Sequence, residues 1–311
     1  MMVRRLSKRF NRAFSFFLIS AVFSACVSGQ KNHENQQEPP QQANAIHVEL
    51  STERVAQGSV LLITAHLPST VDPAFLFASF GDLSFPFFPV PELGTGSFQA
   101  LLGIPLALKP GSNSIRIRYR NDADRSLELS FAVMDGNYPS EVLKVDPGHI
   151  HPNLKNLERI RREATEIGKV YSQVTHEKFW RGPFVLPIQS ETTSRYGTKR
   201  IYNGEMQSFH SGLDLKAAVG TPVSTAAPGV VAFAKNLFLT GNTILVDHGF
   251  GVFTVYAHLN QFKVKVGKRV QAGQLLGLSG QTGRVSGPHL HFSTVVHHVK
   301  VDPIEFLRVV K

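Results

Sequence analysis

Short stretches of alternating apolar and polar residues recur between Ile46 and Val145, which indicates β-strands with one buried face. Turn sequences rich in glycine, proline, asparagine and aspartate separate them, at a spacing typical of a small antiparallel sandwich. The clearest predicted strands are His47–Leu50, Ser59–Ala65, Ser114–Arg120 and Leu127–Val133. Residues 46–145 are therefore predicted to form an immunoglobulin-like (Ig-like) β-sandwich domain. Its core is expected to include the phenylalanines Phe75, Phe77, Phe80, Phe85, Phe87 and Phe88.

The apolar spacing changes to three and four residues from Asn153 to about Lys178. This period predicts one amphipathic helix that starts near Pro152. Residues 146–180 are thus predicted to be a helical connector, packed across the boundary between two domains.

From Trp180 onward the chain is rich in glycine and returns to short alternating stretches. The predicted strands are Pro222–Ser224, Gly229–Ala234, Thr243–Asp247, Val252–His258, Phe262–Val266, Gln274–Ser279 and His289–Val296. The only other helix is expected over Pro303–Leu307. Residues 181–311 are predicted to form an all-β domain, so the fold class of the whole chain is mainly β.

The first 25 residues have the layout of a secretory signal peptide: a basic stretch, the apolar run Ala13–Phe23, and then small residues. Cys26, the only cysteine, follows, and Phe23-Ser24-Ala25-Cys26 resembles the lipobox of bacterial lipoproteins, although leucine is usual where Phe23 stands. Residues 26–45 are almost free of apolar side chains, which predicts a lipidated cysteine and a flexible tether. The alternative is a secreted protein with an incidental cysteine.

The formal net charge is +10, but five of these charges lie in the first 25 residues, which leaves +5 for the remainder. We find no basic, aromatic-interleaved motif, so no nucleic-acid partner is predicted. A single cysteine also excludes a disulfide framework and a cysteine-rich zinc site.

Candidate chemistry is concentrated in three histidine-bearing segments of the C-terminal domain: His210–Asp214, Tyr256–His258 and His289–His291. Residues two apart on a strand project from the same face, so we expect His289 to lie beside His291, and Tyr256 beside His258. Imidazole and carboxylate groups gathered on one sheet face are suitable ligands for zinc.

In this order the segments resemble those of the lysostaphin/LytM-type zinc metallopeptidases, which cleave peptide bonds in bacterial peptidoglycan. The resemblance covers roughly Pro187 to Leu307. It includes Ser194-Arg195-Tyr196-Gly197, His210-Ser211-Gly212-Leu213-Asp214, Tyr256-Ala257-His258-Leu259 and Gly287-Pro288-His289-Leu290-His291-Phe292. It implies one zinc ion per chain held by His210, Asp214 and His291, with His258 and His289 as catalytic histidines. Which of these two is the base stays open.

Other residues are assigned with less support from motifs. Tyr256 and Arg195 are candidates for the substrate groove, Arg195 as a ligand for a carboxylate. The alternative for Arg195 is a surface or structural pairing, and the alternative for Tyr256 is a hydrogen-bond donor to the oxyanion. His248 is expected to be a hydrogen-bonded residue in a turn, and His297 and His298 face opposite ways, so none of these three is included in the site. Asp247 and Asp302 are excluded because they have cap or turn contexts.

The resulting expectation is a zinc-dependent endopeptidase that hydrolyses peptidoglycan stems or cross-links. It is expected to be exported and anchored by a lipid on Cys26, facing the periplasm or cell envelope, and in the outer membrane if the organism is diderm. Its partners would be peptidoglycan, the membrane and a regulatory protein. The alternative is a non-catalytic LytM-like module that binds and activates another cell-wall hydrolase.

Overall fold

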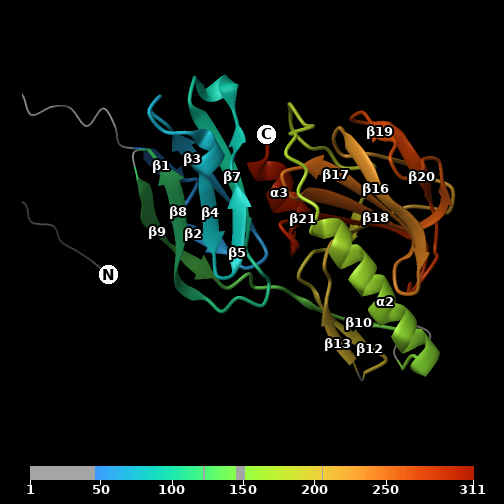
Figure 1. The fold of residues 1–311 in the computed structure, drawn as a ribbon. Helices are drawn as coiled ribbons and strands as arrows, with labels where there is room; N and C mark the ends of the chain where they lie inside the picture. The colour runs from blue at the N-terminus through green and yellow to red at the C-terminus, as the bar shows by residue number, and fades with distance from the viewer. Residues whose placement is uncertain (1–45, 122, 145–150, 205) are drawn as a thin grey trace, which may run out of the picture. The chain divides into compact units, whose positions relative to one another are not determined.

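The computed structural model describes residues 46–121, 123–144, 151–204 and 206–311 (Figure 1). The predicted signal peptide, Cys26 and the tether lie outside the described residues. None of the helices formed by the described residues is long and apolar enough to span a membrane.

Residues from Ile46 to Met134 form two β-sheets with short 3-10 helices between some strands. The first sheet has the order β1 (His47–Leu50), β3 (Val60–His66), β7 (Ser97–Gly103), β6 (Phe88–Pro89). The second has the order β2 (Arg54–Ala56), β9 (Asp124–Met134), β8 (Gly111–Arg120), β4 (Phe77–Phe80), β5 (Leu83–Pro86). The 3-10 helices are η1 (Pro73–Phe75) and η2 (Pro91–Leu93).

The strand order is the one expected for an Ig-like sandwich. The first two strands lie in different sheets, with β1 at the edge of the first sheet and β2 at the edge of the second. Strand β1 pairs antiparallel with β3, whereas β2 pairs parallel with β9. The four predicted strands all form, with bounds shifted by at most a few residues.

The predicted phenylalanine core is confirmed only in part. Phe85 and Phe87 are buried among the aliphatic residues of the sandwich. Phe88 instead packs edge-on against Trp180, with ring centroids 5.3 Å apart. Phe75 is exposed and lies under the Arg120 guanidinium, 3.9 Å from its ring centroid.

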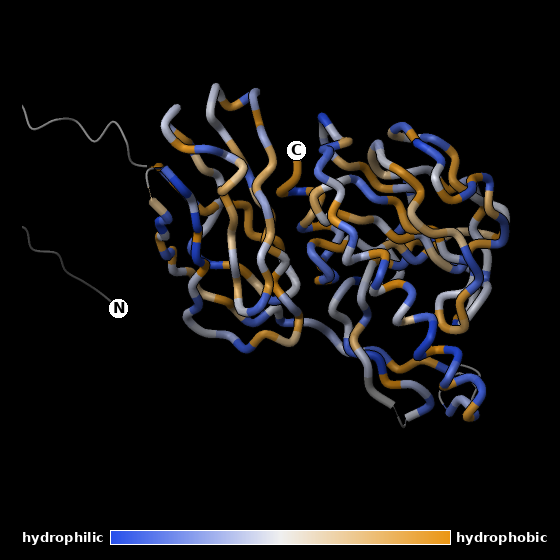
Figure 2. The backbone as a smooth tube through the Cα atoms, in the orientation of Figure 1, coloured by the Kyte–Doolittle hydropathy of each residue, from blue (hydrophilic) through white to orange (hydrophobic). Residues whose placement is uncertain are grey.

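The C-terminal part is built on a ten-stranded sheet, whose central strands are strongly apolar (Figure 2). Its main path is β11 (Thr192–Ser194), β14 (Leu213–Lys216), β21 (His289–Val296), β18 (Val252–Phe262), β17 (Gly241–Gly249), β16 (Gly229–Leu237), β19 (Arg269–Val270). The remaining strands are β15 (Pro222–Ser224), β20 (Leu275–Ser279) and β22 (Val299–Val301). The predicted separate strand Phe262–Val266 is wrong, because β18 continues to Phe262 and the chain then leaves the sheet.

A small third sheet joins a strand that precedes the helical connector to a hairpin of the C-terminal part. Strand β10 (Ser140–Leu143) pairs parallel with β12 (Lys199–Tyr202), which pairs antiparallel with β13 (Met206–Phe209). No pattern in the sequence predicted this sheet.

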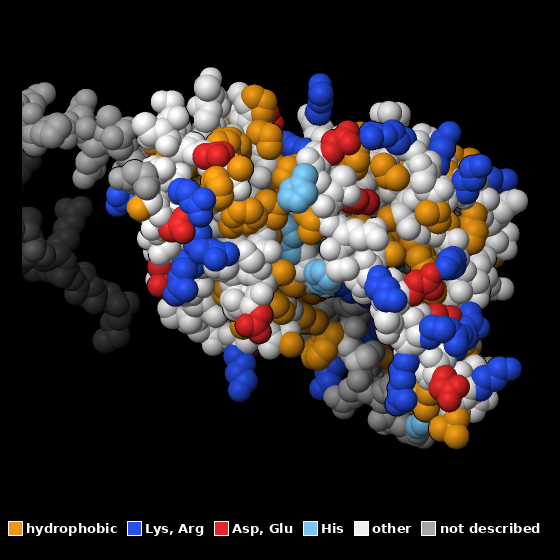
Figure 3. Space-filling view, in the orientation of Figure 1, with side chains coloured by type: hydrophobic (Ala, Val, Ile, Leu, Met, Phe, Trp, Pro, Cys, Tyr) orange, Lys and Arg blue, Asp and Glu red, His pale blue; other side chains and the backbone are white. Residues whose placement is uncertain are grey.

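The connector helix α2 (Leu154–Tyr171) is shorter than predicted. Asn153 caps its start by accepting a hydrogen bond from the Asn156 amide. After Tyr171, tertiary contacts override the helical period: Thr175 bonds to Asp247, and its carbonyl accepts from the Phe250 amide. The buried end of α2 packs on Phe253 of the large sheet. Its outer face mixes basic and acidic side chains (Figure 3).

The final helix, α3 (Pro303–Val309), starts at the predicted residue and ends two residues later than predicted. Asp302 caps it by accepting a hydrogen bond from the Ile304 amide at 2.9 Å.

Candidate metal centre

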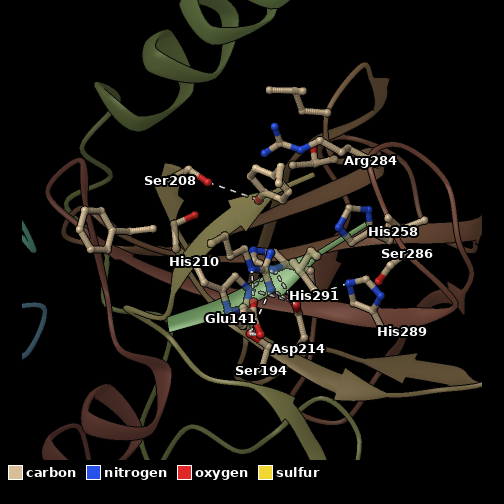
Figure 4. Close-up of a pocket in the computed structure, with 18 of the residues that line it drawn as sticks. Glu141, Ser194, Ser208, His210, Asp214, His258, Arg284, Ser286, His289 and His291 are labelled. Carbon is tan, nitrogen blue, oxygen red and sulfur yellow. Dashed lines mark hydrogen bonds and ion pairs between the residues drawn. The ribbon is translucent and has the colours of Figure 1, made fainter. Parts of the chain in front are cut away.

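The five residues that carry the candidate chemistry line one cavity of about 350 Å³ (Figure 4). His210 follows β13 directly, Asp214 lies on β14, His258 on β18, and His289 and His291 on β21. The sheet brings them together, because β21 lies between β14 and β18. His291 on β21 is paired with Asp214 on β14 and with Ala257, the neighbour of His258, on β18.

Gly212 allows this close approach of β14 to β21. A Cβ atom there would lie 2.4 Å from Ser293 Oγ, 2.5 Å from the Phe292 carbonyl oxygen and 2.7 Å from His291 Cε1. The residue at position 212, between His210 and Asp214, must therefore lack a Cβ atom, which only glycine does.

Three potential ligand atoms converge in the cavity. His210 Nε2 lies 2.9 Å from Asp214 Oδ1 and 3.0 Å from His291 Nδ1, and His291 Nδ1 lies 2.8 Å from Asp214 Oδ1. All three residues are buried.

Hydrogen bonds on the far side of each ring assign its tautomer. His210 Nδ1 lies 2.8 Å from the Arg195 carbonyl oxygen, which can only accept, so Nδ1 carries the proton and Nε2 presents a lone pair. The Ser293 hydroxyl donates to the Ser211 carbonyl and so accepts from His291 Nε2, which leaves the lone pair on Nδ1. Two nitrogen lone pairs and a carboxylate oxygen thus face one another, an arrangement that calls for a cation between them.

The donor set fits zinc. Two imidazole nitrogens and one carboxylate oxygen are common zinc ligands, and ligand bonds of roughly 2.0–2.1 Å in a tetrahedron place donor atoms about 3.3 Å apart. The observed separations of 2.8–3.0 Å are slightly shorter and need only a small outward movement. The residues can hold the ion without rearrangement of the sheet.

Asp214 is held ionised at the centre of the site. Its second oxygen, Oδ2, forms an ion pair with Arg200.

His258 and His289 lie beside this group with their rings 4.8 Å apart. His258 Nδ1 donates to the Thr282 carbonyl at 2.7 Å, and His289 Nδ1 donates to the Gly287 carbonyl at 2.9 Å, so in the neutral form of each ring the lone pair is on Nε2. Burial, followed by the neighbouring histidines, lowers the pKa of His258 to about 3. His258 is therefore neutral at physiological pH.

The prediction that Tyr256 lines the groove is wrong. Its side chain is fully buried, and its hydroxyl accepts a hydrogen bond from the Ala226 amide at 2.7 Å. His258 has a φ of +60°, and the pairing of β18 is irregular around it, so the two-residue alternation between Tyr256 and His258 breaks.

Arg195 lies at the surface, which is the alternative to a place in the substrate groove. Its exposed side chain is not among the residues that line the cavity, and its contribution to the site is the carbonyl that fixes His210. The cavity is lined instead by Arg200 and Arg284, which no motif in the sequence indicated, and by Glu141 from β10.

The residues excluded from the site have other partners. His248 is fully buried at the end of β17 and bonds to the Pro228 carbonyl and Thr254, so it is a hydrogen-bonded structural residue, in a strand rather than in a turn. Asp247 accepts from the Gly249 amide, as expected for a turn context, and Asp302 caps α3. His297 stacks on Phe85, away from the cavity.

Comparison with known protein families identifies the domain that contains this site. Residues 208–303, which contain all five candidate residues, match Peptidase family M23. This region is an M23 peptidase domain. The resemblance to lysostaphin/LytM-type peptidases is thereby confirmed.

Several known proteins are similar to this chain over the M23 domain, and one solved structure is similar over most of the chain. The chain is 46% identical to the peptidoglycan DD-endopeptidase ShyA of Vibrio cholerae over 96 residues. These aligned residues make up 31% of this chain and 22% of ShyA. The chain thus spans about a fifth of that relative's length. It is 35% identical to the lysostaphin catalytic domain of Staphylococcus simulans, covering 38% of this chain and 92% of that one, with a TM-score of 0.34. A peptidase M23 structure from Pseudomonas aeruginosa aligns with 81% of this chain and 94% of that one, at a TM-score of 0.63 and 25% identity.

Proposed function

We propose that the protein is a zinc-dependent endopeptidase that hydrolyses peptide bonds in peptidoglycan stems or cross-links. The observation that carries this proposal is the convergence of three lone pairs, from His210, Asp214 and His291. Hydrogen bonds on the far side of the His210 and His291 rings set the tautomers of these two imidazoles. The named activity of ShyA, a peptidoglycan DD-endopeptidase, supports the substrate class.

His210 Nε2, Asp214 Oδ1 and His291 Nδ1 would hold the ion. The chemistry that bound zinc supplies is Lewis acidity toward a scissile carbonyl and an attacking water.

The two remaining histidines would handle protons. A backbone carbonyl fixes each ring through Nδ1, so in its neutral form each can accept a proton from an attacking water on Nε2 without turning. One would act as the base. The other would hydrogen-bond the developing oxyanion or return the proton to the leaving amine.

Arg284 is the candidate for binding a substrate carboxylate. Its guanidinium lies over the Tyr202 ring, 4.6 Å from the centroid, and both residues line the cavity. The other cavity arginine, Arg200, is already paired with Glu141 and Asp214. An anionic stem peptide would therefore meet Arg284.

The proposal includes export and anchoring through a lipid on Cys26, with the active site in the periplasm or cell envelope. These parts rest on the sequence of the first 45 residues alone.

Two substitutions test the division between ligands and catalytic histidines. His291→Ala is expected to abolish zinc binding and cleavage, because it removes one of three ligands. His289→Ala is expected to keep zinc and lose turnover, because the three ligand atoms that converge come from His210, Asp214 and His291 and His289 is not among them. Metal analysis and peptidoglycan digestion of both variants are the measurements. Equal loss of zinc in both would show that the assignment of ligand and catalyst is wrong.

A further inference from the structure

A chain of charged groups runs from Asp214 to a strand outside the M23 domain. Arg200 on β12 forms an ion pair with Asp214 Oδ2, and its Nε donates to Glu141 Oε1 at 2.7 Å. Glu141 lies on β10, directly paired with Arg200 in the parallel register of β10 and β12. Labelled residues of this group lie below His210 in Figure 4.

Ser194 closes the network. Its hydroxyl lies 3.1 and 3.3 Å from the two Glu141 carboxylate oxygens, and it accepts from the second Arg200 nitrogen at 3.1 Å. Glu141 therefore contacts two side chains that in turn contact Asp214 and His210.

The network is shielded enough for these contacts to matter. The side chains of Arg200, Glu141 and Asp214 are 16%, 25% and 7% exposed. A guanidinium paired through two of its nitrogens is held in one geometry, whereas without Glu141 the contacts to Ser194 and Asp214 would both run through one terminal nitrogen and the group could turn about it. Any turn of Arg200 moves its partner Asp214.

We propose that Glu141 is a positioning residue for the metal centre: it holds Arg200 so that Asp214 presents Oδ1 to the ion. Strand β10, which precedes α2 and lies outside the matched residues 208–303, thus completes the site. The inference rests on the proposed zinc-dependent function. Partners of metal ligands in other sites change metal affinity by roughly 10- to 100-fold when removed.

The test uses the full chain lacking only the predicted signal sequence, with zinc alone as the probe. Zinc affinity is measured by competition with a chromophoric chelator for the wild type, Glu141→Ala and Glu141→Gln. The matched control is Glu191→Gln, because Glu191 forms an exposed ion pair with Lys216 on the same strand β14. Circular dichroism of the metal-free proteins checks folding, and Glu141→Gln decides the outcome if Glu141→Ala does not fold.

We expect Glu141→Ala to weaken zinc binding about 10- to 100-fold and Glu191→Gln to change it less than about twofold. In an Arg200→Ala background, Glu141→Ala should have little further effect, because it acts through Arg200. Equal affinities in Glu141→Ala and the control, or additive losses in the double variant, would overturn the inference and leave the proposed function standing. A wild type that binds zinc but cleaves nothing would contradict the function alone. A wild type that binds no zinc would overturn both.

Discussion

Adding one methyl group at Gly212 should separate the two halves of the metal centre. A Cβ atom would lie 2.4–2.7 Å from Ser293 Oγ, the Phe292 carbonyl oxygen and His291 Cε1, all on β21. Since van der Waals contact needs about 3.4 Å or more, β14 or β21 must move by roughly half an ångström to one ångström. The three ligand atoms lie within 3.0 Å of one another, so a movement of this size is a large fraction of their spacing.

We therefore expect Gly212→Ala to weaken zinc binding at least about tenfold, since metal sites tolerate only small errors of geometry. Overpacking should also lower the free energy of unfolding by about 1–3 kcal/mol. Gly182→Ala is the control, because a Cβ atom at Gly182 meets nothing within 4 Å and its φ is not in the left-handed region. The assays are chelator competition and urea unfolding. Zinc affinity in Gly212→Ala equal to that of Gly182→Ala would refute the steric argument.

Two further predictions concern substrate binding and pH. Arg284→Ala should raise the KM for an anionic stem peptide about tenfold with little change in kcat, because one charge-assisted contact to the substrate is lost. The control is Arg308→Ala, since Arg308 forms an exposed ion pair with Glu305. A fall in kcat alone would contradict the assignment of Arg284. Burial lowers the pKa of His248 to about 4 from its ordinary value of 6.5, so below pH 6.5 the unfolded chain takes up a proton that the folded chain does not. Its contribution to stability is unchanged above pH 6.5 and is lost progressively between pH 6.5 and about 4, which amounts to about 2 kcal/mol at pH 5. In urea unfolding at pH 7.5 and pH 5, His248→Gln should show a smaller difference than the wild type by about that amount, and an equal difference would contradict it.

Local patterns in the sequence predicted most strands of the large sheet. Strands β15 and β21 have the predicted bounds, because their apolar alternation and flanking turn residues agree. The His289 and His291 pair lines the cavity as expected, since β21 keeps regular alternation.

The failures have tertiary causes. Tyr256 was misplaced because a left-handed residue, His258, interrupts β18, and a histidine at positive φ leaves no signal in the pattern of apolar residues. Glu141 and Arg200 are 59 residues apart and meet only through the parallel pairing of β10 with β12. No local period contains that information.

The central claim is tested most directly by metal content and hydrolysis together. The chain from residue 27 to 311 would be analysed for bound zinc and incubated with purified peptidoglycan, with and without a chelator. The account predicts one zinc per chain and chelator-sensitive release of muropeptides with new amine termini. Hydrolysis that persists after complete removal of the metal, or a chain that binds no zinc, would contradict it.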